Sequence, residues 1–296
     1  MPNADFTATL AGNLPAIATI LIVMAALALL EAAIPLRGRG RWNRVHLAPN
    51  LTLTGITFAT NLFFNTALVL MLAWLASRQF GLAHWLGLGA VAAAALTVIG
   101  LDFSFYVAHV AMHKVPALWR FHRVHHSDPA LDVTTTIRQH PGEGVIRYAF
   151  MGAFAVALGA PPAAFAIYRA WSALNGLAEH ADIRLPLWLD NALSLVTASP
   201  NYHKVHHSRR VEETDTNYGN IFSFFDRLFG TCTPAVRGLQ IEYGLDGCDD
   251  QTMQTTRSLL AMPFSAPAPP SPATRPPRTS PGRCCEDPCL DSRACP

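Results

Sequence analysis

Three long apolar runs constrain the fold of this chain more than any other feature of its sequence. They span residues 14–35, 51–76 and 86–108. Each is long enough for the roughly 20 residues with which a helix crosses a bilayer. The composition agrees, because 51% of the 296 residues are hydrophobic and only 14% are charged, which is too apolar for an ordinary soluble domain. We therefore predict an all-α fold, an integral membrane helical bundle.

A fourth apolar segment, residues 145–177, is interrupted by Gly159-Ala160-Pro161-Pro162. Such a break is a turn signal, and it leaves halves of about 14 residues, which is short for a crossing. The segment predicts a helical hairpin. It either dips into one leaflet or crosses twice with thin helices, and both arrangements return the chain to the side on which it started.

The basic residues predict the orientation. Four arginines, Arg37, Arg39, Arg41 and Arg44, follow the first run, and no basic residue precedes it. By the positive-inside rule this loop lies in the cytoplasm and the N-terminus outside. The third run then brings the segment after residue 108 to the cytoplasmic face. The net charge of +2 is small and gives no reason to expect nucleic acid as a partner.

Composition also divides the chain. Residues 1–264 are expected to form one membrane-embedded domain, whereas residues 265–296 are rich in proline, serine and arginine and are expected to be a disordered tail. Four of the six cysteines lie in that tail, at Cys284, Cys285, Cys289 and Cys295. Their spacing fits no zinc or iron–sulfur pattern, so we expect the tail to have no part in the chemistry.

Histidines supply the candidate functional residues. Eight of the twelve fall in three short clusters with spacings of three and four residues: His109 and His113; His122, His125 and His126; His203, His206 and His207. Residues so spaced share one face of a helix and can point their imidazoles at one centre. Imidazole suits iron, zinc, copper or nickel, and eight imidazoles are too many for one ion. Two ions close together are the simplest interpretation.

Other residues have a position but no settled role. Asp102 interrupts the third apolar run, about 10 Å deeper along the axis than His109 and on the same helix face as Tyr106. It is a second-shell partner, lines a substrate pocket, or makes a packing hydrogen bond without a chemical role. His46 and His84 lie in loops before the third run without a histidine at helical spacing, so we expect both to tolerate replacement.

The polar residues after the third run combine into a recognisable pattern. The chain resembles the fatty acid hydroxylase and sterol desaturase superfamily from roughly the third run to Phe264. The resemblance rests on these residues: Asp102, Tyr106, His109-x-x-x-His113, Phe121-His122-x-x-His125-His126-Ser127, Arg138-x-His140-Pro141-x-Glu143, His180, Pro200-x-x-His203-x-x-His206-His207-Ser208, Asp215-x-Asn217-Tyr218-Gly219 and Asp226-x-x-Phe229-Gly230-Thr231. Two positions depart from it, since many members have asparagine at Asp182 and tryptophan at Phe225.

The resemblance implies an integral membrane enzyme with two iron ions at the cytoplasmic face. Such an enzyme uses O2 and two external electrons to hydroxylate or desaturate a lipid. The eight clustered histidines match the family's metal ligands, His180 matches a further one, and His140 matches a histidine that is either ligand or second shell. The candidate catalytic residues are Asp102, Tyr106, Glu143 and Asn217. Asp102, Glu143, Glu179 and Asp182 are also candidates to accept hydrogen bonds from the ligand imidazoles and so orient them.

The sequence restricts the partners only in part. It has no Cys₄ ferredoxin spacing and no flavin fingerprint, so electrons must come from a separate reductase, ferredoxin or cytochrome-type donor. The substrate is expected to be an apolar lipid such as a sterol or a fatty acyl chain, and nothing in the pattern chooses between them. Whether the reaction is hydroxylation or desaturation also stays open.

Three other functions fit the sequence less well. A membrane metallohydrolase would need a base beside its metal, and no H-E-x-x-H motif is present. A ferritin-like bundle would need inward Glu-x-x-His pairs, which are absent. A non-catalytic membrane protein with a structural zinc–histidine site remains, because histidine clusters hold zinc as readily as iron. Product formation that depends on oxygen and reductant would separate the enzyme from the last alternative.

Overall fold

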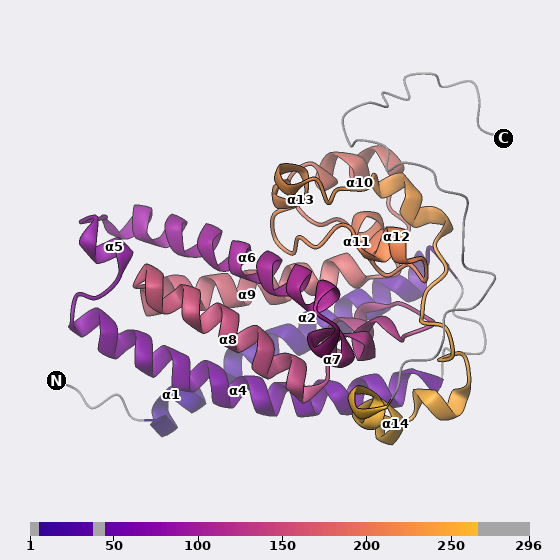
Figure 1. Ribbon diagram of the computed structural model, residues 1–296, viewed down its shortest axis with the longest axis horizontal. Coiled ribbons are helices and arrows are strands. Elements are labelled where there is room, and N and C mark those ends of the chain that lie inside the picture. Colours follow the sequence, from indigo (N-terminus) through magenta and orange to yellow (C-terminus); the bar gives the residue numbers. More distant parts are fainter. Residues whose placement is uncertain (1–5, 38–44, 266–296) are drawn as a thin grey trace.

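The computed structural model describes residues 6–37 and 45–265, and the regular elements among them are all helical (Figure 1). Apart from the helices, the described residues form only two isolated β-bridges, Pro35 with Ile183 and Ser208 with Tyr243. The predicted all-α fold is therefore confirmed. The expected disorder of residues 266–296 and three of the four loop arginines, Arg39, Arg41 and Arg44, lie outside the described residues.

Five long helices make up the bundle: α2 (Leu14–Ala33), α4 (Leu47–Ser77), α6 (Ala90–Lys114), α8 (Pro141–Leu158) and α9 (Pro162–His180). The short helices α1 (Phe6–Gly12) and α5 (Leu82–Trp85) lie at one end of it (Figure 1). The spans that are long and apolar enough to cross a membrane are Leu14–Ala33, Leu47–Trp85 and Ala90–Lys114. They correspond to the three predicted runs, and the chain is a membrane protein by this criterion. The third helix continues six residues beyond the predicted end.

The interrupted apolar segment forms the hairpin of α8 and α9, with 18 and 19 residues. Both helices exceed the expected 14 residues because their polar ends, which the hydropathy pattern left out, continue in helical form. Gly159 ends α8 in the left-handed conformation (φ 65°). A Cβ on Gly159 would lie 2.3 Å from the carbonyl oxygen of Phe80, beside Gly81. The hairpin therefore reaches the turn after α4, and whether it dips into one leaflet or crosses the membrane twice stays a prediction.

The remaining elements form a cap at the opposite end of the bundle (Figure 1). They are α7 (Pro116–His126), η1 (Val133–Ile137), α10 (Leu187–Ser194), α11 (Pro200–His206), α12 (Val211–Thr214), α13 (Phe224–Phe229), η2 (Ala235–Gln240), η3 (Gln251–Gln254), α14 (Thr256–Ala261) and η4 (Met262–Phe264). All eight clustered histidines lie in this cap or in the last turns of α6, so the histidine-rich helical cap is confirmed.

The bundle and the cap bury opposite kinds of side chain. The bundle leaves large apolar side chains exposed, such as Leu29 (75%) and Val91 (86%). The cap buries polar ones, for example Arg138 and Lys204 (both 0% exposed). An apolar exterior is stable only against lipid, and a buried polar group needs partners. The two ends are thus suited to a bilayer and to a polar site, respectively.

Candidate metal centre

Three helix ends and one short helix bring the histidines together. His109 and His113 lie in the last two turns of α6, and α7 begins with Pro116 only two residues after α6 ends. Proline suits the first turn of a helix because its missing N–H needs no partner there. Pro200 starts α11 in the same way, as predicted. Ser199 precedes it in extended conformation, but its side chain forms no capping hydrogen bond.

The histidine side chains form two groups, and within each group the ligand atoms lie within 4.8 Å of one another. The first histidine group consists of His109, His113, His122, His126 and His206. The second histidine group consists of His125, His180, His203 and His207. Together they contain the eight clustered histidines and His180, which is the last residue of α9.

The two groups do not follow the sequence clusters. His122 and His126 are four residues apart and share one face of α7, whereas His125 points to the second group. The short helix α11 is divided in the same manner, with His206 in the first group and His203 in the second. The groups are nevertheless adjacent, because the rings of His126 and His207 stack 4.5 Å apart. Both α7 and α11 therefore contribute histidines to each of the two candidate metal positions.

Hydrogen bonds to carbonyl oxygens determine where three of the rings carry a proton. Nδ1 of His109 lies 2.8 Å from the Tyr218 carbonyl oxygen, and Nδ1 of His180 lies 2.8 Å from that of Gly176. Nδ1 of His206 makes the same contact with Thr216, also at 2.8 Å. A carbonyl oxygen only accepts, so Nδ1 is the donor and Nε2 keeps a bare lone pair in the neutral ring.

These lone pairs converge. Nε2 of His109 lies 3.0 Å from Nε2 of His122, and Nε2 of His180 lies 3.1 Å from those of His125 and His207. Unprotonated nitrogens at this distance repel one another unless a cation lies among them. Burial also lowers the pKa of His122, His125, His126, His203, His206 and His207, and so favours the neutral form that binds metal. The donor sets therefore fit a metal ion in each group.

Carboxylates support the first group. Glu143 Oε1 lies 3.1 Å from Nδ1 of His122 and 3.1 Å from Nε of Arg147, and burial raises the pKa of Glu143 to about 7. Asp215 Oδ1 lies 3.2 Å from Nδ1 of His113, while its Oδ2 accepts a 2.7 Å hydrogen bond from Lys114. Glu143 was expected at the site, but Asp215 and Arg147 were missed. The Asp215-x-Asn217 motif was the available signal for Asp215.

Three of the predicted site residues form hydrogen bonds that hold segments of the cap in place. Asp102 accepts hydrogen bonds from the backbone N–H groups of Ile221 (3.2 Å) and Phe222 (2.9 Å). This is the packing role among the three that the sequence left open. The Tyr106 hydroxyl lies 2.8 Å from that of Thr231, and Asn217 donates through Nδ2 to two carbonyl oxygens.

The braced segment carries Thr216 and Tyr218, whose carbonyl oxygens orient two of the ligand rings. The geometry therefore gives Asp102, Tyr106 and Asn217 an indirect connection with the site. A catalytic role for any of them stays a prediction.

His140 lies outside both histidine groups. Its Nδ1 accepts a 2.9 Å hydrogen bond from Gly142 N–H at the start of α8, and its Nε2 lies 3.3 Å from the carbonyl oxygen of Leu260. Both ring nitrogens are thus engaged with the backbone, so the geometry does not support the predicted role as a ligand. Asp182, the other uncertain candidate, accepts the backbone N–H of Arg37 at 3.2 Å and ties the end of the first span to the cap.

The two histidines expected to be dispensable differ from each other. His84 is exposed on α5, at the far end of the bundle. His46 is only 1% exposed and lies between Asp128 (3.3 Å) and Asp132 (3.4 Å). Burial lowers the pKa of His46, but the hydrogen bond and charge of Asp128 outweigh it and the net pKa is raised. The expectation that His46 tolerates replacement is not supported, because the sequence could not show this burial.

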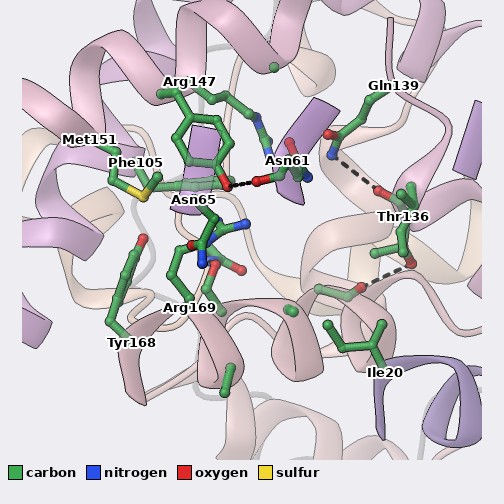
Figure 2. Close-up of a pocket in the computed structure, with 18 of the residues that line it drawn as sticks. Ile20, Asn61, Asn65, Phe105, Thr136, Gln139, Arg147, Met151, Tyr168 and Arg169 are labelled. Carbon is green, nitrogen blue, oxygen red and sulfur yellow. Dashed lines mark hydrogen bonds between the residues drawn. The ribbon is translucent and has the colours of Figure 1, made fainter. Parts of the chain in front are cut away.

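Figure 2 shows part of the lining of a cavity of about 230 Å³ inside the bundle, which extends to the histidines. Its wall is largely apolar and includes Phe58, Leu62 and Met151. At the cap end it is lined by His109 of the first group and by His125, His180 and His203 of the second. The cavity can therefore hold an apolar chain against both groups.

The fold and the site define a class: helical membrane proteins in which two buried histidine groups adjoin an apolar cavity. Residues 94–231 match the family model described as fatty acid hydroxylase. This match covers slightly less than half of the chain and agrees with the resemblance to the fatty acid hydroxylase superfamily that the sequence predicted.

Individual relatives agree with this assignment. The chain is 31% identical over 150 residues to an alkylglycerol monooxygenase of Danio rerio, covering 51% of this chain and 32% of that protein. It is 33% identical over 171 residues to the ornithine lipid hydroxylase OlsE of Rhizobium tropici, covering 57% and 50%. A cholesterol 25-hydroxylase-like protein of Danio rerio is 30% identical over 134 residues, covering 44% and 51%. The chain thus spans between a third and a half of these relatives, and no solved structure matches it.

Proposed function

We propose that this protein is a membrane lipid hydroxylase that holds two iron ions, one in each histidine group. The reaction consumes O2, two electrons and two protons, converts a C–H bond of the lipid to C–OH and releases one water. The observation that carries the proposal is the apolar cavity, which adjoins both buried histidine groups. Relatives named as hydroxylases and monooxygenases favour hydroxylation over desaturation.

The bound iron would supply the redox chemistry that activates oxygen. The residues of this chain hold and orient its ligands. The backbone carbonyl of Tyr218 keeps Nε2 of His109 free for the metal, and Glu143 lies beside Nδ1 of His122, where a carboxylate strengthens an imidazole ligand. The cavity wall seats the apolar chain and excludes water from the histidines.

The electron donor is proposed to dock at the cap from the cytoplasm. The cap end carries the described basic residues Arg37, Lys114 and Arg120, next to membrane-competent helices, and this distribution supports a cytoplasmic position. A cysteine introduced at the exposed Arg120 should be protected from an impermeant thiol reagent added outside intact cells. One introduced at His84 should be labelled. The reverse result would place the cap outside.

A structural zinc site is the second candidate, since the same imidazole sets also accept zinc. To decide, purified protein loaded with iron is given a reductant, isotopically labelled O2 and a lipid extract from its own membrane. A hydroxylase incorporates one labelled oxygen atom into a lipid, and iron-free or zinc-loaded protein does not. Incorporation that is equal in all three preparations would remove the proposed function.

A further inference from the structure

The cavity contains positively charged side chains, which the binding of an apolar chain does not require. Two arginines project into it from different helices, Arg147 from α8 and Arg169 from α9 (Figure 2). Arg147 lies 3.1 Å from Glu143, whose carboxylate balances its charge. Arg169 has no carboxylate partner among the ion pairs of residues 6–37 and 45–265.

Arg169 lies at the depth of the candidate membrane spans. The same cavity is lined by Ile17 and Ile20 of α2 and by Phe58 and Leu62 of α4. An ionised side chain in such surroundings is costly unless a counter-charge reaches it. The guanidinium lies over the ring of Tyr148, whose centre is 5.3 Å from Cζ, and it also forms a hydrogen bond with the Tyr148 side chain.

Neutral polar groups lie near this arginine. The Tyr148 hydroxyl donates to the backbone carbonyl of Asn61 at 3.2 Å, which places Asn61 beside the same ring. The side-chain amide of Asn61 lines the cavity and makes no hydrogen bond to another described residue. Asn65, one turn further along α4, also lines it, and its Nδ2 donates a 3.0 Å hydrogen bond to Oδ1 of Asn13. A guanidinium with amide donors around it is a suitable site for an anionic oxygen.

We propose that the lipid oxidised by this protein carries a carboxylate or phosphate group, which binds Arg169 and Asn61 inside the cavity. That this anionic lipid is the substrate rests on the proposed function. The anion site itself rests on the cavity and on an arginine that has no carboxylate partner among the described residues.

The position of Arg169 also restricts which carbon reacts. His180 lies eleven residues after Arg169 on the same helix, which separates them by about 16 Å along the axis at 1.5 Å per residue. Even an arginine side chain extended toward the histidines leaves several carbon–carbon bonds between the anion and the metal positions. The oxidised carbon therefore lies well down the chain from the anionic group.

The test measures binding, so it does not depend on turnover. Full-length protein in nanodiscs of phosphatidylcholine is titrated with three radiolabelled probes that share one chain: hexadecanoate, hexadecyl phosphate and hexadecanol. Iron-loaded and metal-free protein are compared. We expect at least one anionic probe to bind about tenfold more tightly than the alcohol in both preparations.

Arg169→Gln should lower the affinity for the anionic probe about 10- to 100-fold, as expected for lost charge-assisted hydrogen bonds. The affinity for the alcohol should stay unchanged. Arg169→Lys should fall between. Asn61→Asp adds a negative charge to the cavity, so it should also lower the affinity for the anionic probe and leave that for the alcohol unchanged. Arg78→Gln is the matched control, because Arg78 likewise lies over an aromatic ring (Trp74, 5.5 Å) but does not line the cavity.

A preference for one anionic probe identifies the headgroup as a carboxylate or a phosphate. Equal affinity for all three probes, or equal effects of Arg169→Gln and Arg78→Gln, would overturn the anion site. If anions bind as expected but no oxygen enters a lipid, the proposed function fails and the site stands. If the product carries its hydroxyl next to the anionic group, the placement of the substrate is wrong.

Discussion

The two histidine groups contain the same kind of ligand but differ in what lies behind it. In the first group, Glu143 and Asp215 lie within 3.2 Å of the outer nitrogens of two rings. In the second group, Glu179 is the carboxylate that forms ion-pair contacts among the described residues, 3.8 Å from the outer nitrogen of His180 and 3.7 Å from Nε2 of His203, the nitrogen that faces the other histidines. Carboxylates behind imidazoles raise their basicity and fix their orientation. The first group is thus built to hold its ion more tightly.

The two groups also differ in their relation to the cavity. Of the first group only His109 lines it, whereas three members of the second do, among them His180 at the end of the hairpin. The group with less support is therefore the one more exposed to the substrate. If the proposed function holds, the first group would retain its metal more strongly, and the second would have better access to the carbon that reacts.

Loss of a ligand should have the largest effect in either group. His126→Ala in the first group and His207→Ala in the second should each abolish turnover and lower the metal content from about two ions toward one. Metal analysis and oxygen uptake check this, with His84→Ala as the control that retains both. Full metal and full activity in either variant would remove that histidine from the site.

A chelator should then distinguish the groups. The ion that remains in His207→Ala is held by the first group, and it should survive longer than the ion that remains in His126→Ala. Metal content is measured over time in excess chelator for both variants. Equal rates would mean that the carboxylates of the first group do not strengthen retention.

Glu143→Gln should have a smaller effect and should lower the metal affinity of the first histidine group only. The amide keeps the size of the side chain but removes the charge beside His122, so we expect metal affinity to fall about 10- to 100-fold, as is typical for outer-shell losses. Competition with a calibrated chelator measures it. The exposed Glu212→Gln is the control, and an equal change in both variants would show that the effect is not specific.

His46→Ala should act on the fold rather than on either group. It removes one buried partner of Asp128, which still accepts hydrogen bonds from Asn50 and Thr135, so we expect a cost of about 2 kcal/mol, as for one hydrogen bond to a charged group. Thermal unfolding should begin at a lower temperature, while the folded fraction keeps its metal. Selective metal loss without destabilisation would mean that His46 contributes to the centre directly.

The smallest effect is expected for His140→Ala. Both of its nitrogens serve the backbone near the start of α8, so metal content should stay complete and activity should fall only slightly. The ratio of metal to protein and the rate of oxygen uptake check this. Loss of one ion would restore His140 as a ligand of one of the two metal positions.

The sequence by itself determined the bundle, because apolar runs of sufficient length and a Gly-Pro-Pro break are local signals that a membrane turns into helices. The helical spacing of His109 and His113, or of His122 and His126, likewise placed these pairs on one face. The family pattern then added His180 and Glu143, which spacing alone did not select.

Only the tertiary structure decided how the histidines are shared between two groups. His125 and His126 are neighbours in sequence but belong to different groups, because adjacent residues point about 100° apart and α7 lies between two partner sets. The burial of His46 between two aspartates and the position of Arg169, without a carboxylate partner among the described residues, were equally hidden. Each depends on contacts between residues far apart in the chain, and local patterns carry no information about which distant side chains meet.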